Sequence, residues 1–460
     1  MKPIKTLKVS ISGIRGVVGD SLKPLLVCRF AESFATYLGE GSILVGRDTR
    51  TSGEMVTHAV LAGLMSSGMS VIDVDICPVP TIQFLVRKLR CKGGIAITAS
   101  HNPPQWNALK FIKSSGCFLN RYEAEELLSV YHQEEFKQVE ASRLQPVAQY
   151  PAALGDHLRH ILQTLRPRLT PRLKVVVDCC DGAGSTLTPL LVKELGCDVV
   201  PLNCKPSGYF PRPPEPVPEN LSQLCETVRR HHADVGFAQD ADADRLAIVS
   251  DQGVAIGEEY TLALCARTVL AREQGPVVTN LSTSRMIEDI AGSFGCPVHR
   301  SRVGEVNVTE LMEERGAIFG GEGNGGVIYP RVNMARDSFV GMTLVVDLIR
   351  SSGFTVTELI DQLPRYRMAK SVYEMHPHRI PALIEELTTA YGGEKLNLLD
   401  GLKIEREEGW IHIRPSNTEP ILRVVIEARD EVTLKAFHEE ILGWMSALPP
   451  GQVQSSELKG

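Results

Sequence analysis

The feature that most constrains the fold is a pattern that occurs three times along the chain. A short run of mostly β-branched residues ends in a turn of small or polar residues and is followed by a helical pattern; the clearest runs are 42–46, 173–177 and 276–279. Strands that alternate with helices are typical of parallel α/β sheets, because two parallel strands need a long crossover connection. The pattern therefore predicts three related α/β units.

The pattern changes after Pro364. A helical segment at 381–391 is followed by strand-like runs at 401–404, 409–414 and 421–428 with only short connections between the runs. Short connections favour antiparallel pairing, so we expect a smaller α+β domain here. The predicted boundaries are 1–151, 152–255 and 256–366 for the three α/β domains, 367–448 for the α+β domain and 449–460 for a flexible tail.

Composition excludes several classes of protein. The chain has 460 residues, 43% hydrophobic and 23% charged, which are ordinary globular proportions. Its net charge of −6 provides no basic field for a polyphosphate, so no nucleic-acid partner is expected. The 11 cysteines show no metal-binding CxxC spacing and predict a reducing, cytoplasmic location. We find no signal peptide and no apolar run of bilayer length, and expect no membrane association.

The most specific local signal is the acidic segment 240–245, DADADR. In an extended segment the carboxylates of Asp240, Asp242 and Asp244 point to one side, and hard oxygen ligands of this kind suit Mg²⁺. An acidic surface loop is the alternative. A calcium-binding EF-hand is excluded, because Arg245 stands where that loop requires glycine.

A second signal is the segment 98–103, TASHNP, which follows a strand-like run. A serine at the end of a strand, in a turn that contains proline, is held rigidly, as a nucleophile must be. Ser100 is therefore a candidate nucleophile, and His101 or Lys110 could assist its proton transfer. The alternative is a structural turn closed by the asparagine side chain.

Two further turns carry polar groups. The segment 320–326, GGEGNGG, matches the dinucleotide pattern GxGxxG formally, but an extended run follows it where that site requires a helix. Glu322 and Asn324 suit the vicinal hydroxyls of a sugar instead; a simple hairpin turn is the alternative. The segment 414–420, RPSNTEP, offers a guanidinium, hydroxyls and an amide that suit a phosphate dianion, although it could be an ordinary turn.

Together, and in this order, the four segments resemble the α-D-phosphohexomutase superfamily over nearly the whole chain. Segments 12–16 (SGIRG), 46–53 (GRDTRTSG) and 210–221 are also similar to family segments. The resemblance implies three related mixed α/β domains plus a C-terminal α+β domain around a central cleft. It also implies a reaction: a phosphoserine gives its phosphoryl group to a hexose monophosphate and takes the other phosphate back from the bisphosphate, which interconverts 6-phosphate and 1-phosphate.

The resemblance assigns roles to individual residues. It implies one Mg²⁺ per chain, held by Asp240, Asp242, Asp244 and a phosphoserine oxygen of Ser100. Arg15 and Arg245 would steady phosphoryl oxygens, Lys110 would be the general acid and base, and His101 would be the second choice for that role. The implied substrate-binding residues are Glu322, Asn324, Arg414, Ser416, Asn417, Thr418 and Arg423.

The chain departs from the family pattern at two places: many relatives carry histidine where this sequence has Gly326, and the frequent Asn-Gly after TASHNP is here Asn107-Ala108. The segment GEGNGG together with 303–308 looks most like the phosphoglucosamine mutase and phosphomannomutase branch. We therefore expect conversion of glucosamine 6-phosphate to glucosamine 1-phosphate, activated by glucose- or glucosamine-1,6-bisphosphate, in a monomer or homodimer. The alternatives are a phosphomannomutase/phosphoglucomutase and a catalytically silent sugar-phosphate binder.

Overall fold

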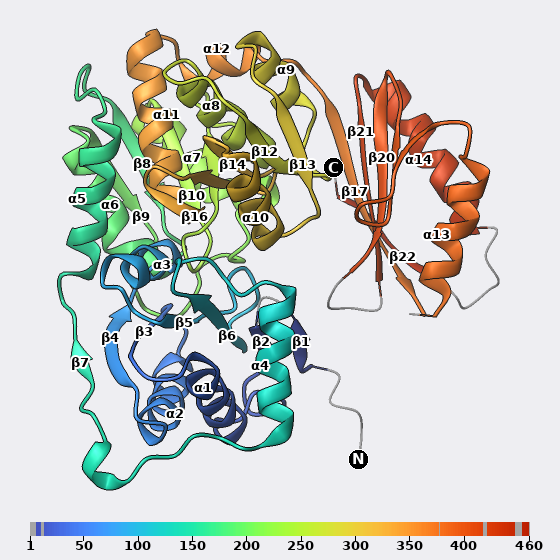
Figure 1. Ribbon diagram of the computed structural model, residues 1–460. Coiled ribbons are helices and arrows are strands. Elements are labelled where there is room, and N and C mark those ends of the chain that lie inside the picture. Colours follow the sequence, from blue (N-terminus) through green and yellow to red (C-terminus); the bar gives the residue numbers. More distant parts are fainter. Residues whose placement is uncertain (1–5, 11–12, 377, 417–420, 447–452, 460) are drawn as a thin grey trace.

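The computed structural model describes residues 6–10, 13–376, 378–416, 421–446 and 453–459. Over these residues the chain forms four sheets, one in each domain, and confirms the predicted α/β architecture with a different C-terminal domain. Figure 1 shows the first three domains packed together and the C-terminal domain set to one side of them. No helix within the described ranges has the length and apolar character that a membrane crossing requires.

Domain I contains a seven-stranded mixed sheet in the order β1-β2-β6-β5-β3-β4-β7. Helices α1, α2 and α4 pack together in this domain, and α3 packs against β3 and β5. Its elements are β1 (Lys8–Ser10), β2 (Gly13–Val17), α1 (Pro24–Leu38), β3 (Ser42–Arg47), α2 (Gly53–Ser66), β4 (Ser70–Ile76), α3 (Val79–Lys88), β5 (Gly93–Ile97), β6 (Trp106–Lys113), α4 (Arg121–Gln133) and β7 (Ala148–Gln149).

Domain II contains a four-stranded sheet and domain III a five-stranded one. The elements of domain II are α5 (Ala153–Leu165), β8 (Lys174–Asp178), α6 (Leu187–Glu194), β9 (Asp198–Leu202), α7 (Ser222–His231), β10 (Val235–Gln239) and β11 (Leu246–Val249). Those of domain III are α8 (Glu258–Leu270), β12 (Val277–Asn280), α9 (Met286–Ser293), β13 (Val298–Ser301), α10 (Glu305–Arg315), β14 (Phe319–Glu322), β15 (Gly326–Tyr329), β16 (Asn333–Arg336), α11 (Ser338–Ser352) and α12 (Val356–Asp361).

The three α/β domains repeat one strand arrangement. In each, a central strand (β3, β8 or β12) pairs in parallel with its two successors, and the second successor pairs with an antiparallel fourth strand. The connection between the third and fourth strands is 98–105 in domain I, 240–245 in domain II and 323–325 in domain III. Three of the four segments singled out from the sequence therefore occupy the same position in a repeated unit.

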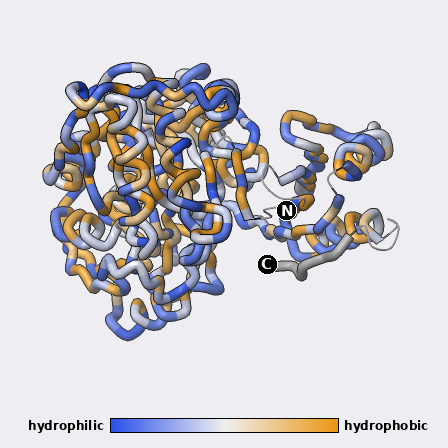
Figure 2. The backbone as a smooth tube through the Cα atoms, turned by 90° about the horizontal axis from the view of Figure 1, so that it is seen from below, coloured by the Kyte–Doolittle hydropathy of each residue, from blue (hydrophilic) through white to orange (hydrophobic). Residues whose placement is uncertain are grey.

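The hydrophobic clusters show which domains share a core. A single hydrophobic cluster extends from Ile161 to Leu363, so domains II and III share a core. Domain I has clusters on both faces of its sheet, and domain IV has its own. Figure 2 shows hydrophobic stretches throughout both the large body and the separate C-terminal domain. Burial of apolar surface thus joins domains II and III more tightly than it joins domain IV to either.

Domain IV contains antiparallel strands β19, β20 and β21, as the sequence predicts. Within the segment 449–460, for which we expected a flexible tail, residues 453–459 form a strand that pairs with β17. Without this partner β17 would be an edge strand with unpaired backbone N–H and C=O groups, and residues 453–459 pair with those groups. The elements are β17 (Arg367–Met375), α13 (Arg379–Ala390), β18 (Lys395–Asn397), β19 (Leu402–Glu405), β20 (Gly409–Pro415), β21 (Ile421–Ala428), α14 (Glu431–Ser446) and β22 (Val453–Lys459).

Candidate active site

The three aspartates of the β10–β11 connection converge. Asp240, Asp242 and Asp244 are fully buried, and each offers a carboxylate oxygen within 4.8 Å of the others. The connection is a turn and not the extended segment that we expected from the alternating spacing. Ala243 has φ of +60°, and the Asp240 carboxylate accepts the backbone N–H groups of Asp244 and Arg245 at 3.2 Å. The turn, closed by its own side chain, brings the carboxylates together.

Two oxygens of this cluster are suited to a cation. Asp242 Oδ1 and Asp244 Oδ1 are buried and accept no hydrogen bond. Burial and the two neighbouring carboxylates raise the pKa of Asp240 well above its ordinary value. Burial also acts to raise the pKa of Asp242, but the ammonium of Lys110 outweighs it and the pKa is lowered. Buried anionic oxygens without partners are costly, and a small divalent cation would satisfy them.

Ser100 lies beside this cluster. Its hydroxyl donates a 2.8 Å hydrogen bond to Asp240 Oδ2, although the two residues are 140 positions apart. Ser100 has φ of +49°, a left-handed conformation that is uncommon for residues other than glycine. Its backbone N–H donates to Thr98 Oγ1 at 3.0 Å. Strained backbone of this kind is concentrated at functional sites, where it fixes a side chain in one direction.

Arg50 fixes the backbone of the Ser100 loop through hydrogen bonds, a role that the sequence alone did not reveal. The buried guanidinium donates to the backbone carbonyls of Ser100 and Asn102, each at 2.7 Å, and pairs with Asp48 at 2.9 Å. It also donates to the carbonyl of Pro103. The segment 46–53 was noted only for its similarity to the family, and these contacts supply its physical function: one buried cation caps several carbonyls of the loop.

The predicted proton-transfer groups also lie at the cluster. Lys110 Nζ donates to Asp242 Oδ2 at 2.7 Å. His101 Nδ1 lies 3.3 Å from Arg245 Nη2. Burial and the charges of Arg245 and Arg15 lower the pKa of His101 to about 2, so its imidazole is neutral at pH 7. The geometry therefore places a lysine against Asp242 and an uncharged histidine beside Arg245.

The two predicted phosphoryl-binding arginines flank the serine loop. Arg15 Nη1 donates to Asn102 Oδ1 at 2.6 Å, which brings β2 against the loop that carries Ser100. Arg245 Nε lies 4.0 Å from Asp240 Oδ2 and 3.9 Å from Asp244 Oδ1. Both guanidiniums thus contact the loop that carries Ser100 or the aspartates beside it.

The sugar-loop residues lie on the neighbouring domain. The Glu322 carboxylate accepts from Asn280 Nδ2 at 2.8 Å and from the backbone N–H of Gly304 at 3.0 Å. Asn324 Oδ1 accepts from the backbone N–H of Gly326 at 3.2 Å. The segment 320–326 is joined through the backbone to the first residue of β11, directly after the aspartate segment 240–245, because the N–H of Leu246 donates to the carbonyl of Gly325 at 3.0 Å.

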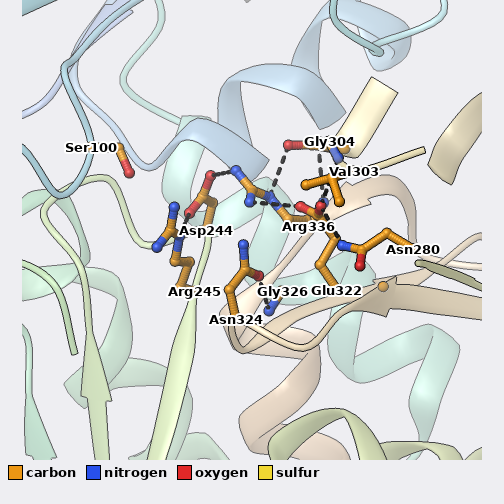
Figure 3. Close-up of polar contacts among 12 residues, drawn as sticks. Ser100, Asp244, Arg245, Asn280, Val303, Gly304, Glu322, Asn324, Gly326 and Arg336 are labelled. Atoms are coloured by element: carbon orange, nitrogen blue, oxygen red, sulfur yellow. Dashed lines mark hydrogen bonds and ion pairs between the residues drawn. The ribbon is translucent and has the colours of Figure 1, made fainter. Parts of the chain in front are cut away.

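Arg336 connects the two loops and is the second residue that sequence reasoning missed. Its guanidinium contacts Asp244 Oδ2, Glu322 Oε2 at 3.1 Å and Glu305 Oε2 at 2.9 Å. Figure 3 shows the Arg336 side chain between Asp244 and Glu322. No spacing rule could have found it, because its three partners lie 14, 31 and 92 positions away in the sequence.

The predicted phosphate loop is described only in part. Arg414 lies at the end of β20 directly opposite Arg423 on β21. Burial and the nearby charge of Arg423 lower the pKa of Arg414, whereas Asp400 and Glu322 act in the opposite direction. Ser416 is described, but Asn417 and Thr418 lie outside the described residues. The strand pairing thus places two arginines opposite each other, next to the start of the predicted phosphate-binding segment.

Comparison with protein families assigns every domain. The chain matches four phosphoglucomutase/phosphomannomutase family models: alpha/beta/alpha domain I at residues 7–138, domain II at 155–253, domain III at 258–366 and the C-terminal domain at 367–443. These matches cover nearly all of the described chain in the order that the fold shows.

Individual relatives agree over the full length. The chain is 35% identical to a probable phosphoglucosamine mutase of Methanopyrus kandleri, over 94% of this chain and 96% of the relative. It is 36% identical to a phosphoglucomutase/phosphomannomutase of Thermococcus kodakarensis, over 93% and 96% respectively.

Among solved structures, a phosphoglucomutase/phosphomannomutase family protein of Burkholderia thailandensis is 25% identical with a TM-score of 0.86, covering 98% of this chain and 99% of that chain. A putative phosphomannomutase from Thermus thermophilus, 23% identical with a TM-score of 0.81 over 96% and 99% of the two chains, shares the fold. With all four domain models matched in order and relatives above 30% identity along the whole chain, this protein belongs to the phosphoglucomutase/phosphomannomutase family of the α-D-phosphohexomutase superfamily.

Proposed function

We propose that the protein is a magnesium-dependent phosphohexomutase that converts glucosamine 6-phosphate to glucosamine 1-phosphate through a phosphorylated Ser100. One observation carries this proposal: the Ser100 hydroxyl lies 2.8 Å from an oxygen of Asp240, within a cluster that has two further buried carboxylate oxygens without a hydrogen bond. A phosphoryl group on Ser100 would stand where those oxygens and the nearby guanidiniums meet.

The residues fit a hard divalent cation. Asp240, Asp242 and Asp244 supply only oxygen ligands, and a phosphoserine oxygen would complete the set, which suits Mg²⁺ better than a softer metal. When bound, the ion would neutralise charge on the transferring phosphoryl group. We further propose a sugar 1,6-bisphosphate as the activator, because it can restore a phosphoserine that has been lost.

The transfer step requires the chain to orient groups and to move one proton. The free sugar hydroxyl attacks the phosphorus, the bond from phosphorus to Ser100 Oγ breaks, and a bond from phosphorus to the sugar oxygen forms. Lys110 Nζ gives a proton to the leaving Ser100 Oγ and takes the proton of the attacking hydroxyl, so that its own protonation is restored at the end of the transfer. In the second transfer Ser100 attacks the other phosphate and the proton moves in reverse. Arg15 and Arg245 hold the phosphoryl oxygens throughout.

The phosphate that does not react would bind to domain IV. Arg414 and Arg423, opposed on β20 and β21, together with Ser416 and the residues Asn417 and Thr418, provide the donors. Glu322 and Asn324 would hold the sugar hydroxyls between that phosphate and Ser100. Binding of the remote phosphate then orients the reacting end, whichever end that is.

The substrate assignment is supported by the relatives named as probable phosphoglucosamine mutases, including those of Methanopyrus kandleri and Thermococcus gammatolerans. The second candidate is a phosphomannomutase/phosphoglucomutase, favoured by the Thermococcus kodakarensis relative of that name, which is equally similar. A cytoplasmic location is also proposed, on the odd number of cysteines and their spacing.

The test compares kcat/KM for glucosamine 6-phosphate, mannose 6-phosphate and glucose 6-phosphate with Mg²⁺ and a trace of the matching bisphosphate. We expect the highest kcat/KM with glucosamine 6-phosphate. Equal values, or a higher value with either other sugar, would replace the substrate assignment by the second candidate. Turnover of none of the three would contradict the mutase proposal itself.

Intact-mass measurement tests the phosphoserine separately. After incubation with a sugar bisphosphate, the wild-type protein should carry one added phosphate, and Ser100→Ala should carry none and should not turn over substrate. Binding of sugar phosphate by the wild type without phosphorylation or turnover would identify a silent binder.

A further inference from the structure

Arg336 occupies a position that the proposed mechanism does not use. Its guanidinium touches carboxylates from three parts of the fold: Asp244 of the metal loop, Glu322 of the sugar loop and Glu305 at the start of α10. Glu305 in turn accepts a hydrogen bond from Gln83 of α3 in domain I. This buried cation therefore joins domains II and III directly, and Glu305 extends the network to domain I. Figure 3 shows the contacts of Arg336 with Asp244 and Glu322.

The contacts of Arg336 leave specific atoms of its partners available. Arg336 binds Oδ2 of Asp244, whereas Oδ1 of the same carboxylate is buried and has no hydrogen-bond partner. The guanidinium thus fixes the rotation of the Asp244 carboxylate and leaves one oxygen for a cation. Groups that hold a metal ligand in this way determine its orientation and affect metal affinity by about 10–100-fold.

The same guanidinium fixes the sugar-loop carboxylate. Arg336 Nη1 binds Oε2 of Glu322, while Asn280 and the backbone N–H of Gly304 bind its Oε1. Three donors on two oxygens hold this carboxylate in one plane. The Glu322 carboxylate can therefore accept further hydrogen bonds only on the sides that these three donors do not occupy.

Gly326 is the residue that makes room for Arg336. A Cβ atom at position 326 would lie 2.3 Å from Cδ and 3.0 Å from Cγ of Arg336. Any side chain there would displace the aliphatic part of the arginine. The absence of the histidine that many relatives carry at this position is thus a packing requirement of Arg336.

We propose that Arg336 is a positioning residue, which aligns the metal-binding carboxylate of Asp244 and the sugar-binding carboxylate of Glu322 with each other. Position 326 is glycine because a side chain there would occupy the space that Arg336 needs. The inference rests on the proposed function, because it assumes that these carboxylates bind Mg²⁺ and the sugar. It predicts that one substitution weakens two binding events whose ligand residues come from different domains.

Calorimetric titration of the dephosphorylated protein with Mg²⁺, and separately with glucosamine 6-phosphate, tests the proposal. We expect Arg336→Met to raise the Kd for Mg²⁺ by about 10–100-fold. We also expect a rise of about tenfold in the Kd for the sugar phosphate, on the scale of one lost charge-assisted contact. Arg336→Lys keeps the charge but cannot reach three carboxylates at once, and should fall between Arg336→Met and the wild type.

Arg336→Met leaves three carboxylates without their cation and could unfold the protein, so a second variant keeps the charge. Gly326→Ala displaces the guanidinium by steric contact, and should raise the KM for glucosamine 6-phosphate and the Kd for Mg²⁺ in the same direction. The matched control is Arg350→Met. Arg350 is also buried, but it donates to the carbonyls of Leu195 and Pro171, and its loss should lower stability without changing either Kd.

The outcomes separate this inference from the proposed function. If the wild type binds both ligands and folded Gly326→Ala and Arg336→Lys keep both Kd values within twofold, the positioning role of Arg336 is wrong and the function stands. A wild type that binds neither Mg²⁺ nor glucosamine 6-phosphate contradicts the proposed function itself. A change in Arg350→Met equal to that in Arg336→Met would show a general effect of instability and overturn the inference.

Discussion

Replacing Asp240 with asparagine tests whether the three aspartates are arranged for a cation at the expense of stability. Their ligand oxygens lie within 4.8 Å of one another. At an effective dielectric constant of about 20, two like charges at that distance repel by about 3.5 kcal/mol. When it is ionised, Asp240 takes part in two such repulsions, and Arg245 Nε, 4.0 Å away, offsets about one of them; the remainder adds to the effect of burial in raising the pKa of Asp240.

We therefore expect Asp240→Asn to stabilise the protein by about 1–3 kcal/mol when Mg²⁺ is absent. The asparagine carbonyl can still accept the backbone N–H groups of Asp244 and Arg245, and the Ser100 hydroxyl can accept from the new amide as readily as it donated to the carboxylate. Mg²⁺ at 100 times its Kd should raise the free energy of unfolding of the wild type by about 2.7 kcal/mol. The Asp240→Asn variant should lose this stabilisation.

The assay is thermal unfolding in EDTA and in excess Mg²⁺. The wild-type Tm should rise with Mg²⁺, whereas the Asp240→Asn Tm should be higher in EDTA and unchanged by the ion. Asp178→Asn is the control, because Asp178 ends the neighbouring strand β8 and pairs with Arg212 at 2.9 Å. Its loss leaves a buried guanidinium unpaired and should cost about 3 kcal/mol. If Asp240→Asn lowers the Tm in EDTA as Asp178→Asn does, the aspartates hold the fold and the reasoning is refuted.

Three further outcomes follow from the site and the domain contacts. Lys110→Met retains Ser100 but removes the proposed proton-transfer group, and should lower kcat by about 10²–10⁴-fold in steady-state assays. An unchanged kcat would show that Lys110 does not transfer the proton. Burial lowers the pKa of His412, which lies 2.8 Å from Ser282 of domain III, to about 4, below its unfolded value of about 6.5. As the pH falls, the unfolded chain therefore binds this proton before the folded protein does, and the stability that is present above pH 6.5 is lost towards pH 4. A plot of Tm against pH should fall less steeply for His412→Gln than for the wild type. Parallel plots would contradict this role of His412. Gly325 has φ of +82°, and a Cβ there would lie 2.3 Å from the carbonyl oxygen of Leu246. Gly325→Ala should therefore lower the Tm and raise the KM for the sugar phosphate, and kinetics identical to wild type would show that the loop adjusts freely.

The sequence by itself determined the features that depend on residues close together in the chain. The alternation of strands and helices predicted three α/β units, and the strands β3, β8 and β12 are where the runs indicated. The segment 240–245 predicted a cluster of carboxylates, because three aspartates within five residues stay close in nearly any conformation. The turn that brings them together was not predicted, since it depends on a left-handed residue at Ala243 and on hydrogen bonds to Asp240.

Only the tertiary structure decided which distant groups complete the site. Arg336 is 92 residues from Asp244 and Arg50 is 50 residues from Ser100, yet each fixes its partner through contacts of its guanidinium. The strand β22 likewise required the free edge of β17, which no property of the tail itself reveals. Such pairs form because the packing of sheets and helices brings residues together that are distant in the sequence. Their energies depend on burial and on distance, which are properties of the folded structure and not of sequence spacing.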